Sequence, residues 1–238
     1  MTLPKTIKPL IVLSLASAAS ASAAVVSWNL DNNGTLATTN VAGVVAVANW
    51  NNSFPSNPVT NLKDDTGVAT TVDISYASFN TFRIQGSHPG VDGNGTYNKE
   101  LLNGYLNSGS TQTPASSSVT ISQIGYAQYN IIVYFSSDVA GRTGTVTDGT
   151  TVYDFATLGS ASISGSNAVL TQTTSMGGSN PGANYAIFSG LTGATKTVSV
   201  NIPSFGGIAG FQVVAVPEPS AALLGGLGLF GLLRRRRA

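Results

Sequence analysis

The sequence predicts an all-β protein, built as a β-sandwich and flanked by one hydrophobic segment at each end. Through the central part of the chain, short runs rich in Val, Ile, Tyr and Phe alternate with clusters of Gly, Ser, Asn and Pro, a pattern typical of short strands joined by turns. No long stretch there has the apolar spacing of a helix. Charged residues make up 9% and hydrophobic residues 42% of the chain, which indicates a folded domain, because disorder accompanies high charge and few apolar residues.

About eleven short strands are expected within roughly 190 residues, which favours a β-sandwich of the jelly-roll kind. They are expected at Val25–Leu30, Val41–Ala48, Thr70–Tyr76, Thr81–Gln85, Ser118–Ile121, Tyr129–Phe135, Gly144–Thr147, Thr150–Phe155, Asn184–Phe188, Thr197–Ile202 and Gly210–Val214. Asp148-Gly149 between two of them predicts a hairpin, and Asp31–Gly34, Pro114–Ser117 and Ser175–Gly182 are expected as turns or loops. Asn98–Asn107 is the one expected helical turn. No fixed repeat is present, which argues against a propeller or solenoid.

Composition excludes several kinds of chemistry. The chain has no cysteine and one histidine, so it has neither disulfides nor thiolate chemistry, and no multi-histidine metal site. Six of its eleven basic residues lie in the terminal segments, which leaves five basic against nine acidic residues in the central domain. This domain therefore has no basic stripe for nucleic acid.

The N-terminus has the three parts of a secretory signal peptide. Lys5 and Lys8 form the charged start, an apolar run begins at Leu10, and Ala21-Ser22-Ala23 matches the small-residue cleavage pattern. We expect residues 1–23 to be removed, with cleavage after Ala24 as the alternative, so that the ectodomain covers residues 24–215.

The C-terminal segment, residues 216–238, predicts a membrane-inserted helix. Its apolar part, Ala221–Leu233, covers about 20 Å at 1.5 Å per residue, and a full span takes about 20 residues. The arginine stems of Arg234–Arg237 can extend it by snorkelling, and their charge favours the cytoplasmic side. Pro217 and Pro219 prevent the helix from continuing into the domain. A simple single-span anchor is the alternative.

This tail resembles the PEP-CTERM sorting signal of exopolysaccharide-producing Gram-negative bacteria. The resemblance rests on three elements in fixed order: Pro217, Glu218 and Pro219, then the Gly/Leu-rich apolar segment, then Arg234, Arg235, Arg236 and Arg237. It implies that exosortase, a membrane-embedded cysteine protease-transpeptidase, recognises and removes the tail. The protein would then be tethered to the inner membrane with its domain in the periplasm, and reach the cell surface or the medium after processing.

The order of several central segments is similar to that of jelly-roll ectodomains on other PEP-CTERM proteins, which are loosely akin to galactose-binding-like modules. The segments are VAGVVAVANWNN, LLNGYLNS, YNIIVYFSSD, YAIFSGLTG and GGIAGFQVV. The resemblance implies a central strand at Ile131–Tyr134 and a closing strand at Gly210–Val214. It implies a fold and not an activity, because such sandwiches carry many functions.

Candidate catalytic and metal-binding residues are sparse. His88 lies near Ser87 and Asp92, but no G-x-S-x-G motif accompanies them, and we expect a loop histidine facing solvent. The stretch Asp92–Thr96 begins like a calcium loop, whereas Tyr97 and Asn103 stand where an EF-hand needs Gly and Glu. No cofactor is expected, and calcium in a site of another kind stays open.

Acidic pairs give the rival enzymatic hypothesis. Asp64 and Asp65 are adjacent, and adjacent residues of a strand point to opposite faces, so a solvated turn is expected there. Asp73 with Asp154 is the candidate carboxylate pair of a glycoside hydrolase, which needs the two groups about 5 to 9 Å apart. The scarcity of His, Cys, Glu and Lys instead predicts a domain that is not an enzyme.

Trp50, followed by Asn51 and Asn52, is the candidate glycan contact, because an aromatic face beside amides suits a sugar. We favour the interpretation that Trp50 instead closes the end of the sandwich core, and exposure of its ring decides between the two. Tyr97 and Tyr105 flank the expected helical turn, where they could line a cleft. The expected function is that of a surface or extracellular-matrix protein associated with exopolysaccharide. A carbohydrate-binding module and a glycan-active hydrolase are the alternatives.

Overall fold

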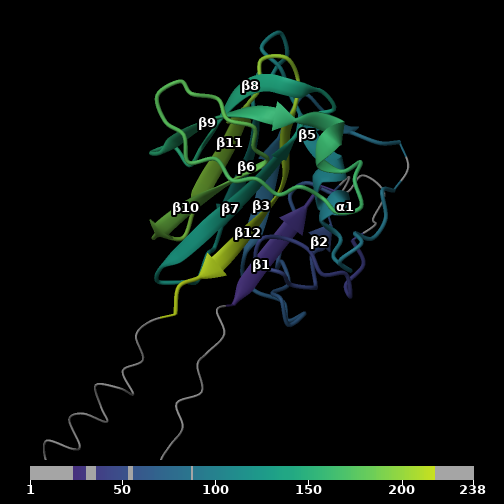
Figure 1. Cartoon of the computed structure of the whole chain (residues 1–238). Helices are drawn as coiled ribbons and strands as arrows, with labels where there is room; N and C mark the ends of the chain where they lie inside the picture. The colour runs from purple at the N-terminus through teal and green to yellow at the C-terminus, as the bar shows by residue number, and fades with distance from the viewer. Residues whose placement is uncertain (1–23, 31–35, 53–55, 87, 218–238) are drawn as a thin grey trace, which may run out of the picture. The chain divides into compact units, whose positions relative to one another are not determined.

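Two five-stranded sheets form the body of the protein, in a computed structural model that describes residues 24–30, 36–52, 56–86 and 88–217 (Figure 1). The first sheet has the order β10-β7-β12-β1-β2, with β1 at Val25–Asn29, β2 at Asn51–Asn52, β7 at Tyr129–Ser136, β10 at Tyr185–Leu191 and β12 at Gly207–Ala215. The second sheet has the order β3-β6-β11-β8-β9, with β3 at Asp73–Ala77, β6 at Ser117–Ser122, β8 at Ala140–Thr147, β9 at Val152–Leu158 and β11 at Lys196–Asn201. Neighbouring strands are antiparallel, except that β1 and β2 are parallel.

A smaller ribbon and two short helices complete the described part of the chain. The ribbon pairs β4 (Asn80–Arg83) with β5 (Gly104–Asn107). Helix α1 covers Asn98–Asn103 directly before β5, and a 3-10 turn, η1, covers Gly159–Ser162.

The core lies between the sheets and brings together side chains from both. Trp28 of β1 is fully buried there and stacks on Phe211 of β12, with ring centroids 5.7 Å apart. Phe135 of β7 stacks on Phe155 of β9 at 3.9 Å, which joins the first sheet to the second. The predicted β-sandwich is confirmed, and its jelly-roll connectivity stays a prediction.

A second apolar cluster covers the outer face of the first sheet. Ile131 and Val133 of β7 point into the main core, whereas Ile132 and Tyr134 join the second cluster with Leu101 of α1. Successive residues of a strand face opposite sides, so both faces of β7 are covered by protein. This explains why β7 is a continuous apolar run and not an alternating one.

Most of the expected strands are present, and two expectations are wrong. Residues 41–48 form a tight turn closed by a bridge between Ala42 and Val47, and not a strand, because Gly43 takes a φ of 93°. The expected helical turn at Asn98–Asn107 ends at Asn103, and its second half is strand β5. The predicted hairpin at Asp148-Gly149 is confirmed between β8 and β9.

Residues Ala23–Val216 form one compact unit. Within the described residues, no helix is long and apolar enough to cross a membrane. Several predicted features lie outside the described residues, namely Ala21 and Ala23, the turn at Asp31–Gly34, Ser87, Glu218, Pro219, Ala221–Leu233 and Arg234–Arg237.

Candidate functional site

The strand that closes the sandwich leads directly to the C-terminal tail. The Ala215 amide donates a 2.9 Å hydrogen bond to the Ala24 carbonyl, and the Val216 amide donates one of 2.9 Å to the Gln128 carbonyl. Pro217 is the next residue. The first proline of the tail therefore follows the folded domain without a spacer.

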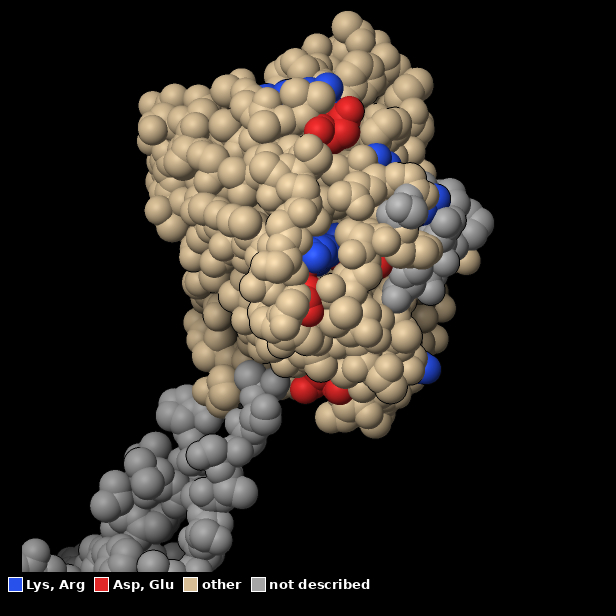
Figure 2. Space-filling view, turned by 45° about the vertical axis from the view of Figure 1, so that its right-hand side comes forward, with Lys and Arg blue, Asp and Glu red and all other residues tan. Residues whose placement is uncertain are grey.

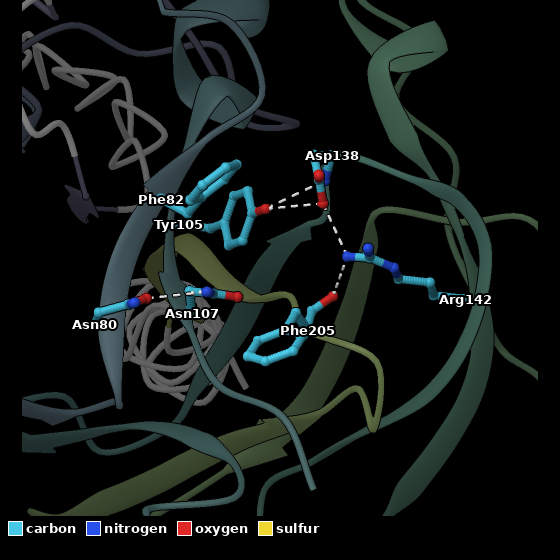
Figure 3. A pocket seen from close by; sticks show the side chains of 7 residues that line it. All are labelled: Asn80, Phe82, Tyr105, Asn107, Asp138, Arg142 and Phe205. Carbon is cyan, nitrogen blue, oxygen red and sulfur yellow. Dashed lines mark hydrogen bonds and ion pairs between the residues drawn. The ribbon is translucent and has the colours of Figure 1, made fainter. Parts of the chain in front are cut away.

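A cavity of about 270 Å³ opens near the other end of β12 (Figure 3). It is lined by Asn80, Phe82, Tyr105, Asn107, Asp138, Arg142 and Phe205. Phe205 precedes β12 by two residues, and β12 has nine residues. At about 3.3 Å per residue, the cavity lies roughly 26 Å along the strand from the tail junction.

One wall of the cavity is a single face of the β4–β5 ribbon. The register places Asn80 opposite Asn107 and Phe82 opposite Tyr105. Residues two apart on a strand share a face, so these four side chains lie together. Asn107 Nδ2 donates a 2.9 Å hydrogen bond to Asn80 Oδ1, and the Phe82 and Tyr105 rings are 5.9 Å apart between centroids. Phe82 is 44% exposed.

The other wall comes from the two turns that connect the sheets at this end. Figure 3 shows the side chain of Arg142, on β8, directed towards Asp138 and the Phe205 carbonyl. Arg142 Nη1 lies 2.8 Å from Asp138 Oδ1 in an ion pair and donates a 2.8 Å hydrogen bond to the Phe205 carbonyl. These contacts hold the two turns against each other.

Phe205 has an unusual backbone, with a φ of 77°. Such a φ is uncommon for any residue other than glycine, and it is sterically unfavourable for a bulky side chain. The Phe205 carbonyl accepts hydrogen bonds from Arg142 Nη1 and from Ser137 Oγ, at 2.8 and 3.1 Å. These bonds help to hold the Phe205 ring at the cavity, where glycine would be the easier residue for the turn.

Tyr105 acts as a neutral hydrogen-bonding group in this cavity. Burial raises the pKa of its phenol well above the ordinary value of 10.0, and the negative charge of Asp138 raises it further. The Tyr105 hydroxyl accepts a 3.2 Å hydrogen bond from the Asp138 amide and lies 3.4 Å from Asp138 Oδ1. A phenol with this pKa does not serve as a base near neutral pH.

Comparison with known proteins decides what the C-terminal tail is. The family model described as PEP-CTERM protein-sorting motif matches residues 215–237. The chain carries a PEP-CTERM sorting motif. The match begins at Ala215, the last residue of β12, so the motif starts where the sandwich ends. No curated protein and no solved structure matches the chain.

The PEP-CTERM motif has consequences for the whole chain. It indicates an exported protein that is anchored through its C-terminal region and processed by exosortase. The recognition residues are therefore a site on which another enzyme acts. Pro217 is the one residue of the tripeptide within the described part of the chain.

Trp50 is buried, as expected of a residue that closes the core, and is not an exposed glycan contact. The Trp50 side chain is 3% exposed and packs in the second apolar cluster, where its Nε1 donates to the Val47 carbonyl at 3.1 Å. Asn51 Nδ2 donates to the Ser27 and Lys63 carbonyls, and Asn52 Nδ2 donates to the Leu36 carbonyl. Asn51 thus joins β1 to the segment at Lys63, Asn52 holds the segment at Leu36, and Trp50 offers no open ring face to a sugar.

The candidate carboxylate pair also needs correction. Asp73 lies on β3 and Asp154 on β9, the two edges of the second sheet. Four strand spacings of about 4.8 Å already separate the two strands by roughly 19 Å, about twice the separation that glycoside hydrolysis uses, and the register also places the two residues at different levels along the sheet. Asp73 accepts hydrogen bonds from Asn61 and Gln123, and Asp154 accepts one from the Gly178 amide.

The remaining candidates have structural partners. Asp92 is buried and accepts bonds from the Asn98 and Ala168 amides, both at 2.8 Å, so its oxygens are engaged by the protein. His88 Nδ1 lies 3.5 Å from Glu100 Oε2. Among the described residues, no group of three or more His, Asp or Glu side chains is placed to hold a metal ion.

Sequence reasoning identified one lining residue of the cavity, Tyr105, and missed the others. A signal was present in the two short patterns Asn-Thr-Phe at residues 80–82 and Tyr-Leu-Asn at residues 105–107. Each pattern places an amide and an aromatic residue two apart, as one face of a strand requires.

Proposed function

We propose that this PEP-CTERM protein is a non-enzymatic surface or extracellular-matrix protein of a Gram-negative cell, and that it associates with exopolysaccharide. Exosortase releases the ectodomain from the inner membrane, and the sandwich then contacts the polymer at its free end. The observation that carries the proposal is the end cavity, which combines aromatic rings, paired amides and one ion pair.

The position of the cavity supports this role. The tail leaves the sandwich at Val216, and the cavity lies near the start of β12, at the other end of the same strand. A domain held at its tail end therefore keeps the cavity accessible. The cavity is accessible in this way while the tail anchors the protein in the membrane, and also if the processed protein is later attached through the same end.

The surface chemistry also suits a hydrated polymer. Figure 2 shows one face on which few acidic and basic residues are scattered among uncharged ones, in keeping with 9% charged residues overall. Ser, Thr and Asn side chains can hydrogen-bond hydroxyl groups without a strong long-range field.

The placement of acids supports a role without catalysis. Asp138, the acid in the cavity, is paired with Arg142 at 2.8 Å. A glycoside hydrolase needs a second carboxyl group within about 10 Å as a general acid or nucleophile. The seven lining residues supply no such partner.

Two measurements on the full-length protein in its host test the proposal. Mass spectrometry should find a mature form that lacks Arg234–Arg237, and Pro217→Ala with Pro219→Ala should retain the tail in the membrane fraction. The mature protein should co-sediment with polysaccharide purified from the same culture. A dominant surface form that keeps the four arginines contradicts the processing, and mature protein that stays in the supernatant contradicts the association.

A further inference from the structure

We infer that the end cavity binds one neutral sugar ring of a polysaccharide, with the apolar face of the sugar on Phe82. This inference rests on the proposed function and assigns its ligand class and contact residues. A pyranose presents C–H groups on its faces and hydroxyls around its rim, so it needs one apolar surface and several polar groups beside it.

Phe82 supplies the apolar surface. Its ring is 44% exposed although it lies opposite the buried Tyr105, and the Tyr105 ring supports it from one side at 5.9 Å between centroids. Exposing so much of a phenyl side chain to water is unfavourable, because burying apolar area lowers the free energy. A sugar face covering Phe82 recovers part of that free energy.

The amide pair supplies hydrogen bonds beside this ring. Asn107 is 6% exposed, and its Oδ1 is buried without a hydrogen-bond partner, whereas buried acceptors normally have one. Figure 3 shows Asn107 Oδ1 on the side of the amide away from Asn80, towards Phe205. This oxygen is enclosed by protein, so the group that a hydroxyl entering the cavity can reach is the exposed Asn80 amide, which Asn107 Nδ2 holds through its Oδ1.

The ion pair favours a neutral ligand. Asp138 and Arg142 are the charged residues of the lining, and at 2.8 Å their charges offset each other. A carboxylated sugar would be attracted by Arg142 and repelled by the adjacent Asp138 at a similar distance. A neutral diol can instead donate to the carboxylate and accept from the guanidinium, and both side chains are partly exposed.

The volume limits the ligand to one ring. About 270 Å³ lies just below the range of about 300–1,000 Å³ that is usual for small-molecule pockets. The cavity therefore holds a chain end or a single side-branch residue of a polymer. The rest of the polymer would lie over the surface outside it.

Isothermal titration with the ectodomain, residues 24–216, tests the inference. This unit contains all the strands and both apolar clusters described above. The probes are size-matched neutral and uronic-acid-containing oligosaccharides prepared from the host polymer or from defined glucans and uronans, at physiological salt. We expect neutral oligosaccharides to bind at least tenfold more tightly than carboxylated ones.

Matched variants locate the site. Phe82→Ala and Asn80→Ala should each weaken binding about tenfold, the effect of losing one well-placed contact. Phe79→Ala is the control, because Phe79 is 47% exposed, lies three residues from Phe82 and does not line the cavity. It should change affinity by less than about twofold. Circular dichroism verifies each fold, and Asn80→Ala carries the test if Phe82→Ala is unfolded.

The outcomes separate the inference from the proposed function. If the ectodomain binds host polymer but Phe82→Ala and Asn80→Ala bind as well as wild type, the cavity assignment is overturned and the association survives. If carboxylated oligosaccharides bind as tightly as neutral ones, the ligand class is overturned. If neither the host polymer nor any oligosaccharide binds, both are overturned.

Discussion

The Ala215 amide donates a 2.9 Å hydrogen bond to the carbonyl of Ala24, so the end of β12 is held by the residue that expected signal-peptide cleavage leaves first. Ala24, which directly precedes β1, borders the expected signal-peptide cleavage, and Val216, which directly follows β12, borders the PEP motif. The start of β1 and the end of β12 lie side by side at one end of the sandwich (Figure 1). The folded domain thus places its export and sorting junctions on neighbouring strands. The end cavity is left at the far end of the same strand.

We predict that a spacer before the PEP motif speeds removal of the tail. Proteases bind substrate as an extended, unpaired peptide, whereas Ala215 and Val216 are paired with Ala24 and Gln128. Inserting Gly-Ser-Gly-Ser between Val216 and Pro217 leaves these pairs in place and adds unpaired backbone directly before the motif. Pulse-chase labelling with immunoblotting should show a several-fold shorter half-life of the unprocessed form.

The control for the spacer is the same insertion between Gly149 and Thr150, the exposed residues of the β8–β9 turn. It adds equal length without changing the junction and should leave the rate unchanged. Equal half-lives of the spacer variant and wild type would mean that the end of β12 is already unpaired, or not yet folded, when exosortase acts.

We predict that Gln212 is a strong stability determinant although it is polar. Gln212 is fully buried, its Oε1 accepts from the Tyr134 hydroxyl at 2.7 Å, and its Nε2 donates to the Val45 carbonyl at 2.8 Å. Gln212→Leu leaves buried groups without partners and should cost about 1–3 kcal/mol for each. Thermal unfolding should show a melting temperature lower by several degrees. The exposed Gln172→Leu is the control, and an equal effect of both would contradict the role of the Gln212 contacts.

We predict that calcium does not stabilise the ectodomain through Asp92. Both oxygens of Asp92 accept bonds from protein donors, Oδ2 from Thr96 and the Asn98 amide and Oδ1 from the Ala168 amide. A calcium ion would have to replace them. The melting temperature should be the same in millimolar calcium and in EDTA, while Asp92→Asn should lower it in both. A rise in calcium that Asp92→Asn abolishes would contradict this prediction.

Most strands could be predicted from the sequence because the alternation of apolar and polar residues along a strand reflects which of its faces is buried. In β6 and β11, buried and exposed positions alternate residue by residue, and a period of two is visible without knowing the fold. The apolar run at residues 41–48 was wrongly predicted as a strand, because the residues that pack against it are distant in the sequence. Gly43 lies against the Gln212 side chain, which is 169 positions later and leaves no local signal.

The cavity was less predictable for a related reason. Its residues come from four separate stretches, which are brought together by the β4–β5 register and by the contacts of Asp138 and Arg142 with each other, with Tyr105 and with Phe205. Predicting this register from the sequence required recognising that the helix ends at Asn103 and that strand β5 begins at Gly104. Trp50 drew attention as a possible sugar contact because amides flank it, and its burial agrees with the favoured interpretation that a large aromatic side chain closes the core.

The final prediction concerns the loss of stability in alkaline solution. Burial raises the pKa of Tyr105, with a further contribution from Asp138, and burial also raises the pKa of Tyr134. Because the pKa is higher in the folded state than in the unfolded state, the unfolded chain releases its proton first as the pH rises. The stabilisation is therefore fully present below pH 10 and is lost as the pH rises from there towards the folded-state pKa. Each such tyrosine adds a slope of about 1.4 kcal/mol per pH unit to the free energy of unfolding.

Urea unfolding between pH 9 and 11.5 should therefore give a steep decline in wild type and a shallower one in Tyr105→Phe, by about the slope of one proton. The comparison uses slopes because Tyr105→Phe also removes the hydroxyl contact with Asp138 at every pH. Parallel declines in the two proteins would show that Tyr105 ionises as readily in the folded chain as in the unfolded one.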